Sequence, residues 1–367
     1  MTIKLKMSNW NKDKPYNDLP TLPPKIELET KEVLKKCVSA RVALEGLRQA
    51  VALIPNPELL IHTIPILEAQ ASSEIENIVT TTDTLFRFMD TPEKADPMTK
   101  EALRYRTALW VGLDSLKTCP MSGRTAVAVC SALRNTNVDV RKLPGTYIGT
   151  AATHRIVYTP PSGEEIIREK LWNWAEFLNE NSPLDPLVRL SVAHYQFEAI
   201  HPFDDGNGRT GRVLNILYLV DQKLLDLPIL YLSRYIIRHK SDYYARLLEV
   251  TEKGAWQPWI LYMLEAIRDT AQWTCEKVLA IRALQEETVR TMKEDPKLRK
   301  IYSRELTDLI FSMPYTRINT LIEKKIGTRQ TVAKYLDALV AAGILQEAKT
   351  SKTRLFLNVR LLDLLLS

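Results

Sequence analysis

Apolar residues recur at helical spacing along most of this chain, and this pattern constrains the fold more than any other feature. Early examples are the runs KEVLKKCVSARVALEGLRQAVALI, IPILEAQASSEIENIV and MTKEALRYRTALWVGLDSL. Apolar residues three and four positions apart lie on one face of a helix. Only 12 glycines interrupt the 367 residues. The pattern therefore predicts a mainly α-helical protein, after an extended, proline-dotted segment over residues 1–30.

One segment, LPGTYIGTAATHRIVYTPPSG at 143–163, breaks the helical pattern. It pairs two β-prone runs, Thr146–Ile148 and Arg155–Tyr158, and ends in a Pro-Pro-Ser-Gly turn, which is typical of a β-hairpin. The exposed edge of a strand can pair with an extended peptide. We expect the 145–161 hairpin to hold a protein target with its tip near Thr153–Ile156. A hairpin that only closes the domain is the alternative.

The last seventy residues change character after the charged stretch 293–300, which we interpret as a linker. They predict helix, helix, helix and hairpin, the order of a winged helix-turn-helix. The predicted domains are a helical N-terminal region (1–100), a central core (101–292) and the winged helix-turn-helix (298–367). The expected recognition helix begins at Thr328 and ends near Gly343.

Basic and polar residues of this C-terminal domain could contact phosphates. DNA binding is therefore one expectation, and dimerisation or target docking is the competing role. The residues concerned are Arg329, Gln330 and Lys334 on the helix and Lys349, Lys352 and Arg354 on the wing.

The bulk composition argues against several classes of protein. A net charge of +6 permits a polyanionic partner but does not demand one. No apolar run approaches the roughly 20 residues of a membrane span, and the N-terminus lacks the apolar core of a secretion signal. The four cysteines form no C-x-x-C pair, which argues against a zinc site or a disulfide framework. We expect a cytoplasmic protein without a membrane partner.

The stretch HPFDDGNGRTGR at 201–212 is the densest cluster of chemically capable residues. Gly206, Gly208 and Gly211 match the G-x-G-x-x-G pattern of a dinucleotide-binding turn, and Asp226 lies at a suitable distance. That turn needs a preceding strand. The preceding LVRLSVAHYQFEAI has the apolar spacing of a helix, so the dinucleotide interpretation fails on its context.

The residue types themselves indicate phosphate chemistry. The glycines open a helix whose N-terminal N–H groups suit an anion. Arg209 and Arg212 lie on its first turn, where cations oppose the helix dipole, unless a polyphosphate occupies the space above. Asp205 suits Mg²⁺, which favours one or two carboxylates plus phosphate oxygens. His201 can take a proton near neutral pH. The alternative is that His201 is a core histidine whose hydrogen bonds are all made within the protein, and that the glycines only begin a helix.

The same twelve residues match the Fic motif, H-x-F-x-[D/E]-G-N-G-R-x-x-R, at every defined position, so the chain resembles the Fic family. The resemblance implies a helical Fic core with a β-hairpin flap that moves AMP from ATP onto a hydroxyl side chain of a protein. His201 would deprotonate that hydroxyl and Asp205 would hold Mg²⁺. The expected ATP contacts are Gly206, Asn207 and Gly208 as an anion hole, Arg209 and Arg212 on phosphates with Arg212 on the γ-phosphate, the intervening Thr210 and Gly211, and Tyr235 as an adenine neighbour. His201 and Glu76 are expected to contact the nucleotide as well. Tyr235 could equally be a core aromatic.

A second short pattern, SSEIEN at 72–77, resembles the inhibitory motif of that family, [S/T]-x-x-x-E-[G/N]. Ser72, Glu76 and Asn77 stand in its defined positions. The resemblance implies that Glu76 pairs with Arg212. An arginine that a carboxylate engages cannot also hold the γ-phosphate. Alone, the pattern would fit an exposed acidic helix end.

Together these observations predict a protein adenylyltransferase restrained by Glu76, with ATP and Mg²⁺ as substrate and cofactor. Its target would be another protein or the chain itself, and a homodimer is expected from the habit of the family. Three alternatives stay open. They are removal of AMP from a protein, transfer of another phosphate-containing group, and a DNA-binding regulator whose core only senses ATP.

Overall fold

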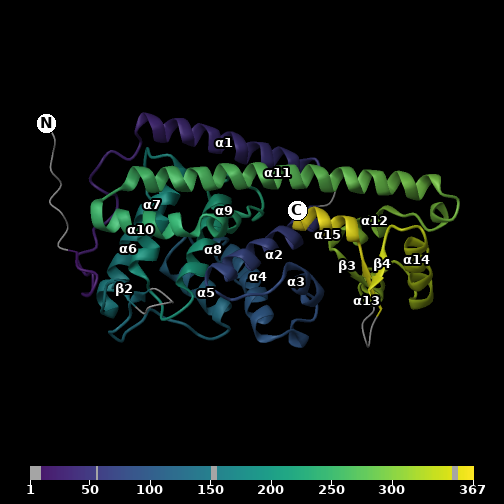
Figure 1. The fold of residues 1–367 in the computed structure, drawn as a ribbon, viewed down its shortest axis with the longest axis horizontal. Helices are drawn as coiled ribbons and strands as arrows, with labels where there is room; N and C mark the ends of the chain where they lie inside the picture. The colour runs from purple at the N-terminus through teal and green to yellow at the C-terminus, as the bar shows by residue number, and fades with distance from the viewer. Residues whose placement is uncertain (1–9, 55–56, 150–154, 349–353) are drawn as a thin grey trace.

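The structure is a computed structural model and describes residues 10–54, 57–149, 155–348 and 354–367. It is mainly helical with short strands, as the sequence predicts (Figure 1). Its α-helices are α1 (Lys31–Ala52), α2 (Glu58–Ile75), α3 (Thr82–Phe88), α4 (Pro97–Leu116), α5 (Gly123–Arg134), α6 (Glu164–Asn179), α7 (Pro186–Ile200), α8 (Asn207–Asp221), α9 (Leu232–Arg238), α10 (Lys240–Lys253), α11 (Trp256–Glu294), α12 (Arg304–Ser312), α13 (Ile318–Glu323), α14 (Arg329–Ala341) and α15 (Val359–Leu366). The strands are β1 (Ile148–Gly149), β2 (Ile156–Tyr158), β3 (Tyr315–Arg317), β4 (Gln346–Ala348) and β5 (Leu355–Leu357), and two 3₁₀ turns are Pro92–Lys94 and Leu298–Lys300.

Helix α11 joins the two ends of the molecule. Its 39 residues span about 58 Å at 1.5 Å per residue, and α1 packs along it (Figure 1). It ends where Asp295 takes an extended conformation before Pro296, because a residue before proline avoids the helical region. The interpretation of 293–300 as a linker is therefore wrong at both ends. Residues 293 and 294 are helical, and the 3₁₀ turn Leu298–Lys300 buries Leu298.

Helices α7 and α8 form the centre of the core. Nearly all residues of both helices are buried, and both carry apolar residues on every side, as expected for a helix that other elements surround. The two helices pack against each other. Helices α6 and α11 pack against α7, and helices α4 and α5 pack against α8. The loop 201–206 that connects them is therefore held between two rigid elements.

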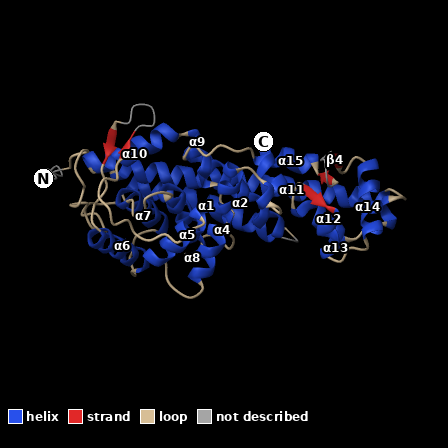
Figure 2. Ribbon diagram, turned by 90° about the horizontal axis from the view of Figure 1, so that it is seen from below, coloured by secondary structure: helices blue, strands red, loops and turns tan. Residues whose placement is uncertain are grey.

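The predicted hairpin is present as an antiparallel pair in which Ile148 faces Tyr158 (Figure 2). Its strands are shorter than the predicted runs. Thr153 and His154, from the expected tip, lie outside the described residues. The N-terminal segment from residue 10 is irregular and buries Tyr16, Leu19 and Leu22 against the core, which agrees with an extended segment on the surface.

The C-terminal elements follow the predicted order of helix, helix, helix and hairpin, as α12, α13, α14 and β4–β5. Strand β3 adds an edge to the hairpin and gives an antiparallel sheet in the order β3-β5-β4. Arg329, Gln330 and Lys334 are exposed, as predicted. Arg354 instead pairs with Glu347 and Asp337 of its own domain. Lys349 and Lys352 lie outside the described residues.

The C-terminal domain contacts α2 through α12 and α3 through β3, and it forms one end of the molecule, drawn in yellow in Figure 1. The Tyr315 hydroxyl donates to Asp83, and the Arg87 guanidinium lies 5.7 Å from the centre of the Tyr315 ring. Arg317 donates to the Arg87 carbonyl at 2.6 Å and pairs with Asp90 at 3.2 Å. Strand β3 therefore contacts the helix that follows the 72–77 motif.

Within the described ranges, no helix combines the length and the apolar character that crossing a bilayer requires.

Candidate active site

The 201–212 stretch forms a tight corner between α7 and α8. His201 ends α7 in the left-handed region (φ 49°, ψ 60°), and Gly206 takes φ 87° immediately before α8. A left-handed conformation costs a histidine about 1 kcal/mol or more, and glycine tolerates it. The buried Asn207 side chain braces the corner, because its Nδ2 donates to the Phe203 carbonyl at 2.7 Å and its Oδ1 accepts from the Phe203 N–H at 2.9 Å.

The carboxylate of Glu76 lies over the N-terminus of α8. A Cβ placed on Gly208 would collide with Glu76 Oε1 and would come within 3.0 Å of Arg212 Nη1. The first-turn N–H groups of a helix and its dipole favour an anion at this position. In this conformation the anion at that position is the Glu76 carboxylate.

Arg212 completes this contact from the second turn of α8. It is 1 % exposed, and its Nη2 donates to Glu76 Oε1 at 2.8 Å. Its Nε donates to Ser72 Oγ and its Nη2 to the Ser72 carbonyl, both at 2.8 Å. Burial opposes the charge, but the carboxylate of Glu76, helped by Tyr243 and Glu198, raises the pKa of Arg212 above its usual value. The 72–77 motif therefore holds this arginine with two residues.

Helix α2 presents Glu76 through an anchor two turns earlier. Glu68, Ser72 and Glu76 are spaced by four residues and share one face. The buried Glu68 carboxylate accepts from the Ser233 N–H at 2.8 Å, the Ser233 hydroxyl at 2.5 Å and the Tyr105 hydroxyl at 3.1 Å. Burial raises the pKa of Glu68 to about 7. Sequence reasoning missed this residue, although an acid inside the apolar run IPILEAQA was the signal for it.

His201 is neutral at physiological pH. Burial, reinforced by the positive charge of Arg141, lowers its pKa to about 4 despite the nearby Glu76. Arg141 also fixes the corner, since its Nε donates to the His201 carbonyl at 2.8 Å. A neutral imidazole has a free lone pair and can accept a proton.

Asp205 and Arg209 belong to a chain of ion pairs on the other side of the corner. Arg134 of α5 pairs with Asp205, and the 2 % exposed Arg209 pairs with Glu101 of α4 at 2.7 Å, with Asp205 3.8 Å away. Arg209 is thus directed toward α4, not toward Glu76. No group of three or more potential metal-ligand side chains occurs in the described part of the chain. The half-exposed Asp205 carboxylate fits an Mg²⁺ ion that takes its other ligands from phosphates and water.

A cavity of about 180 Å³ brings together His201, Gly208, Arg212 and Glu76. Aromatic and apolar side chains from the hairpin, α7 and α10 form its other walls, which suits a purine ring better than a small ion. The remaining lining residues are Ile148, Val157, Tyr158, Tyr195, Glu198, Ala199, Tyr243, Tyr244, Leu247, Leu248 and Thr251.

Six of the predicted ATP contacts are not among the residues that line this cavity: Gly206, Asn207, Arg209, Thr210, Gly211 and Tyr235. Gly206 and Asn207 form the corner itself, and Arg209 is directed toward Glu101. Tyr235 lies on α9, where its ring packs 4.3 Å from His239 and 5.4 Å from Tyr262, centre to centre. Thr210 is fully buried. Gly211 faces α7, where a Cβ would collide with Glu198 and come within 3.2 Å of Phe197. Tyr243 and Tyr244 provide the aromatic walls that were expected from Tyr235.

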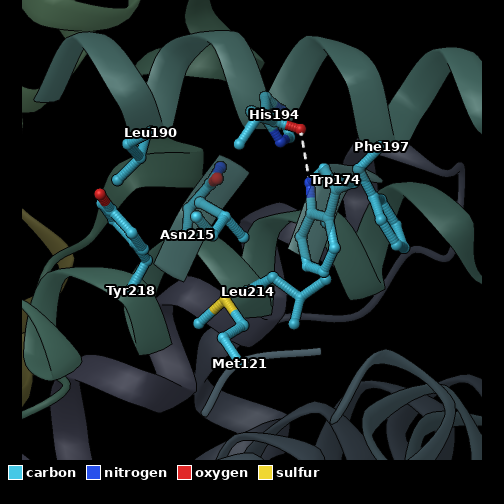
Figure 3. A pocket seen from close by; sticks show the side chains of 11 residues that line it. Met121, Trp174, Leu190, His194, Phe197, Leu214, Asn215 and Tyr218 are labelled. Carbon is cyan, nitrogen blue, oxygen red and sulfur yellow. Dashed lines mark hydrogen bonds between the residues drawn. The ribbon is translucent and has the colours of Figure 1, made fainter. Parts of the chain in front are cut away.

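A second, much smaller cavity lies behind Gly211 between α7 and α8 (Figure 3). Its volume of about 10 Å³ admits at most one water molecule. Figure 3 shows His194, Asn215 and Tyr218 around it, with the Trp174 indole donating to the Ala193 carbonyl at 3.0 Å. A nucleotide cannot enter, so this cavity is part of the core packing behind the candidate site.

Three family models match this chain in sequence. They are described as "Fic/DOC family N-terminal" over residues 34–114, "Fic/DOC family" over residues 123–219, and "Protein adenylyltransferase SoFic-like, C-terminal domain" over residues 284–361. The first contains Glu76 and the second contains the whole 201–212 stretch.

Curated relatives are similar over part of the chain. The protein adenylyltransferase fic-1 of Caenorhabditis elegans is 35% identical over 108 residues, which are 29% of this chain and 20% of the relative. A probable protein adenylyltransferase of Aquifex aeolicus is 39% identical over 64 residues, 17% of this chain and 19% of the relative. The matched stretch thus spans about a fifth of each relative's length.

Solved structures share the fold. A Fic family protein from Desulfovibrio desulfuricans superposes with a TM-score of 0.56 at 21% identity, over 91% of this chain and 98% of that one. A Fic-1 fragment from C. elegans superposes with a TM-score of 0.51 at 18% identity, over 69% of this chain and 74% of the fragment. At these identities the likeness concerns the fold alone.

Proposed function

This chain belongs to the Fic/DOC family, and we propose that it is a protein adenylyltransferase that its own Glu76 holds inactive. It would transfer AMP from ATP to a hydroxyl side chain of a target protein, or of itself, and release pyrophosphate. One observation carries the proposal. A neutral histidine, a helix N-terminus that suits an anion and a buried arginine share one cavity with the Glu76 carboxylate, which lies against Gly208 and pairs with that arginine.

The residues of the cavity suit each part of this reaction. Tyr243 and Tyr244 offer aromatic walls for the adenine, and the first turn of α8 offers N–H groups to the phosphates. His201 would take the proton of the target hydroxyl while the hydroxyl oxygen bonds to the α-phosphorus and the bond to pyrophosphate breaks. Asp205 would hold Mg²⁺, which neutralises charge on the phosphates. Most of the rate enhancement would come from position and charge.

Glu76 would inhibit by direct competition. Arg212 donates to Glu76 Oε1 at 2.8 Å, and the same carboxylate covers Gly208. A γ-phosphate cannot reach Arg212 until this carboxylate moves. ATP that binds beside it would be displaced from the pose that attack on the α-phosphorus requires. Because Glu76 directly follows the last residue of α2, a motion of that helix would move the carboxylate relative to Arg212.

A protein target would bind along the hairpin. Ile148, Val157 and Tyr158 line the same cavity as His201, so a peptide paired with this edge would bring its hydroxyl toward the base. The cytoplasmic location, the homodimer and DNA binding by the C-terminal domain stay predictions.

The test is label transfer with Mg²⁺ and ATP labelled on either the α- or the γ-phosphate, with cell lysate as target source. The proteins are wild type, Glu76→Gly, Glu76→Gly/His201→Ala, and Glu74→Gly as a matched control. Glu74 lies in the same turn of α2 but hydrogen-bonds to Gln70 instead of Arg212. We expect protein-bound label from the α-phosphate only, strong in Glu76→Gly, weak in wild type and Glu74→Gly, and absent in the double variant.

Other outcomes point to the alternatives. Label from the γ-phosphate would indicate kinase-like transfer. No label from either position would refute AMP transfer, and an AMP-modified protein would then test AMP removal, in which Glu76 could orient water. A shift of DNA mobility without any label transfer would favour the ATP-sensing regulator.

A further inference from the structure

A second carboxylate in the cavity has no place in the Fic motif. Glu198 lies in the last turn of α7, three residues before His201, and both residues line the cavity. Its Oε1 is buried and has no hydrogen-bond partner. The carboxylate lies against α8, as shown by the collision that a Cβ on Gly211 would make with Glu198 Oε1. The glycine therefore leaves the room that this side chain occupies.

Glu68 provides an internal comparison. It is also a buried glutamate whose pKa burial raises to about 7, but three donors satisfy its oxygens and it anchors α2. Glu198 Oε1 has none of these bonds. A buried acceptor without a hydrogen bond costs roughly 1–3 kcal/mol of stability. A purely structural role therefore does not explain why Glu198 lies in the same cavity as His201.

We propose that Glu198 is the proton acceptor behind His201, to which the histidine passes the proton that it takes from the target hydroxyl. This inference rests on the proposed function. In the first step the O–H bond of the target breaks, a ring nitrogen of His201 gains the proton, and the oxygen bonds to the α-phosphorus as pyrophosphate leaves with the P–O electron pair. In the second step His201 returns to its neutral form and Glu198 becomes a neutral carboxyl. Glu198 then releases the proton to solvent when the cavity opens.

The electrostatics of the cavity support this direction of transfer. Burial raises the pKa of Glu198 to about 7, and burial lowers the pKa of His201 to about 4, so the carboxylate is the stronger base of the two. Environments that push two neighbouring pKa values apart assign donor and acceptor roles. The opposite directions of the two pKa shifts favour transfer from the histidine to the carboxylate, and this transfer would regenerate the base after each turnover.

The charged groups around Glu198 set its titration. Arg212 lowers the pKa of Glu198, and Glu76 raises it. Removal of Glu76 therefore shifts the titration downward, and the phosphates of a bound nucleotide restore negative charge at the same place. The titratable groups that face it are Glu76 after α2, His194 and His201 on and after α7, Arg212 on α8, and Tyr243 and Tyr244 on α10.

The first experiment measures initial rates of AMP transfer between pH 5 and 9 in the Glu76→Gly background, with Glu198 unchanged or replaced by Gln, Asp or Ala. With Glu198 present, the rate should rise through an inflection near neutral pH. Glu198→Gln should lose about tenfold or more in rate, since proton transfer to a side chain contributes 10²–10⁴-fold in full, and should lose the inflection. Glu198→Asp should restore the inflection. The KM for ATP should stay unchanged, and an equal rate loss at every pH with the inflection intact would overturn the proposal.

A second measurement does not depend on transfer. Carbon-13 NMR of glutamate carboxyls in the wild-type protein, where Glu76 is present, should show two groups that titrate near neutrality, one lost in Glu68→Gln and the other in Glu198→Gln. If Glu198→Gln removes no such group, the proposal fails even where transfer is intact. If transfer is absent while both groups titrate, the proposed function has failed, and with it the relay.

Discussion

Replacing Glu76 in two ways measures how strongly the carboxylate restrains the enzyme. Removing one partner of a buried ion pair costs about 3–5 kcal/mol, and an exposed pair contributes about 0–1 kcal/mol. Arg212 is 1 % exposed and Glu76 is 33 % exposed, so the pair falls between these limits, at about 2–3 kcal/mol. Each 1.4 kcal/mol corresponds to a factor of ten. Glu76→Gly should therefore raise the rate of AMP transfer by roughly 30- to 150-fold.

Glu76→Gln separates charge from shape. The amide oxygen can still accept from Arg212, but a neutral hydrogen bond is about half as strong as a charge-assisted one. About half of the restraint should remain, so Glu76→Gln should be roughly tenfold more active than wild type. The assay is the initial rate of α-label transfer at saturating ATP, with Glu74→Gly as the control for a looser helix end.

The order wild type, Glu76→Gln, Glu76→Gly is the critical result. If the glutamine variant equals wild type, the restraint comes from the shape of the side chain and not from its charge on Arg212. If the glutamine variant matches the glycine variant, the whole restraint is electrostatic. If neither variant exceeds wild type while both still bind ATP, the competition between Glu76 and phosphate is refuted.

Three further predictions follow from contacts outside the cavity. Burial raises the pKa of Glu68 from 4.5 to about 7. The contribution of this group to the free energy of unfolding is therefore complete below pH 4.5 and is lost as the pH rises through 7. In Glu68→Gln the free energy of unfolding, measured with urea, should fall less over this pH range. Arg317→Ala removes hydrogen bonds between β3 and the end of α3 that contribute about 0.5–1.5 kcal/mol, and it should raise the basal rate of AMP transfer by about two- to tenfold. Arg354→Ala removes ion pairs within the C-terminal domain and should leave that rate unchanged. Asn207→Ala leaves the Phe203 backbone unpaired and should lower the unfolding free energy by about 1–3 kcal/mol and abolish transfer even with Glu76→Gly, as denaturation curves and label transfer would show.

The local pattern of the sequence was enough to predict the parts of the site that are close in sequence. The helical spacing of the residues before His201 excluded the strand that a dinucleotide-binding turn requires. In the structure, residues 201–206 do form a corner between the two helices α7 and α8. The contact of Glu76 with Arg212 spans 136 residues, and it was expected only because two short patterns resembled one family. Composition and periodicity do not determine such a distant pair.

The walls of the cavity could not be predicted in the same way. Tyr235 and Tyr243 both lie on helices that follow the motif. Only the packing of α9 and α10 places Tyr235, half-buried, against His239 and Tyr262, and Tyr243 in the wall of the cavity. Arg209 looked equivalent to Arg212 because both sit on one helical face. Its ion pair with Glu101 on α4 directs it away, and that partner depends on tertiary structure.

The restraint by Glu76 is small enough for another part of the chain to control. A pair of about 2–3 kcal/mol leaves roughly one to three per cent of the molecules with Arg212 free, and the apparent affinity for a correctly placed ATP falls by the same factor. The contacts of Arg317 and Tyr315 with α3 begin only seven residues after Glu76, at Asp83. They have an energy of the same order as the pair. A ligand that draws the C-terminal domain away from α3 would therefore need a differential binding energy of only this size to open the site. By linkage, ATP would in turn weaken the hold of that domain on α3, so nucleotide-dependent hydrogen exchange in residues 82–90 would test the coupling without any knowledge of the ligand.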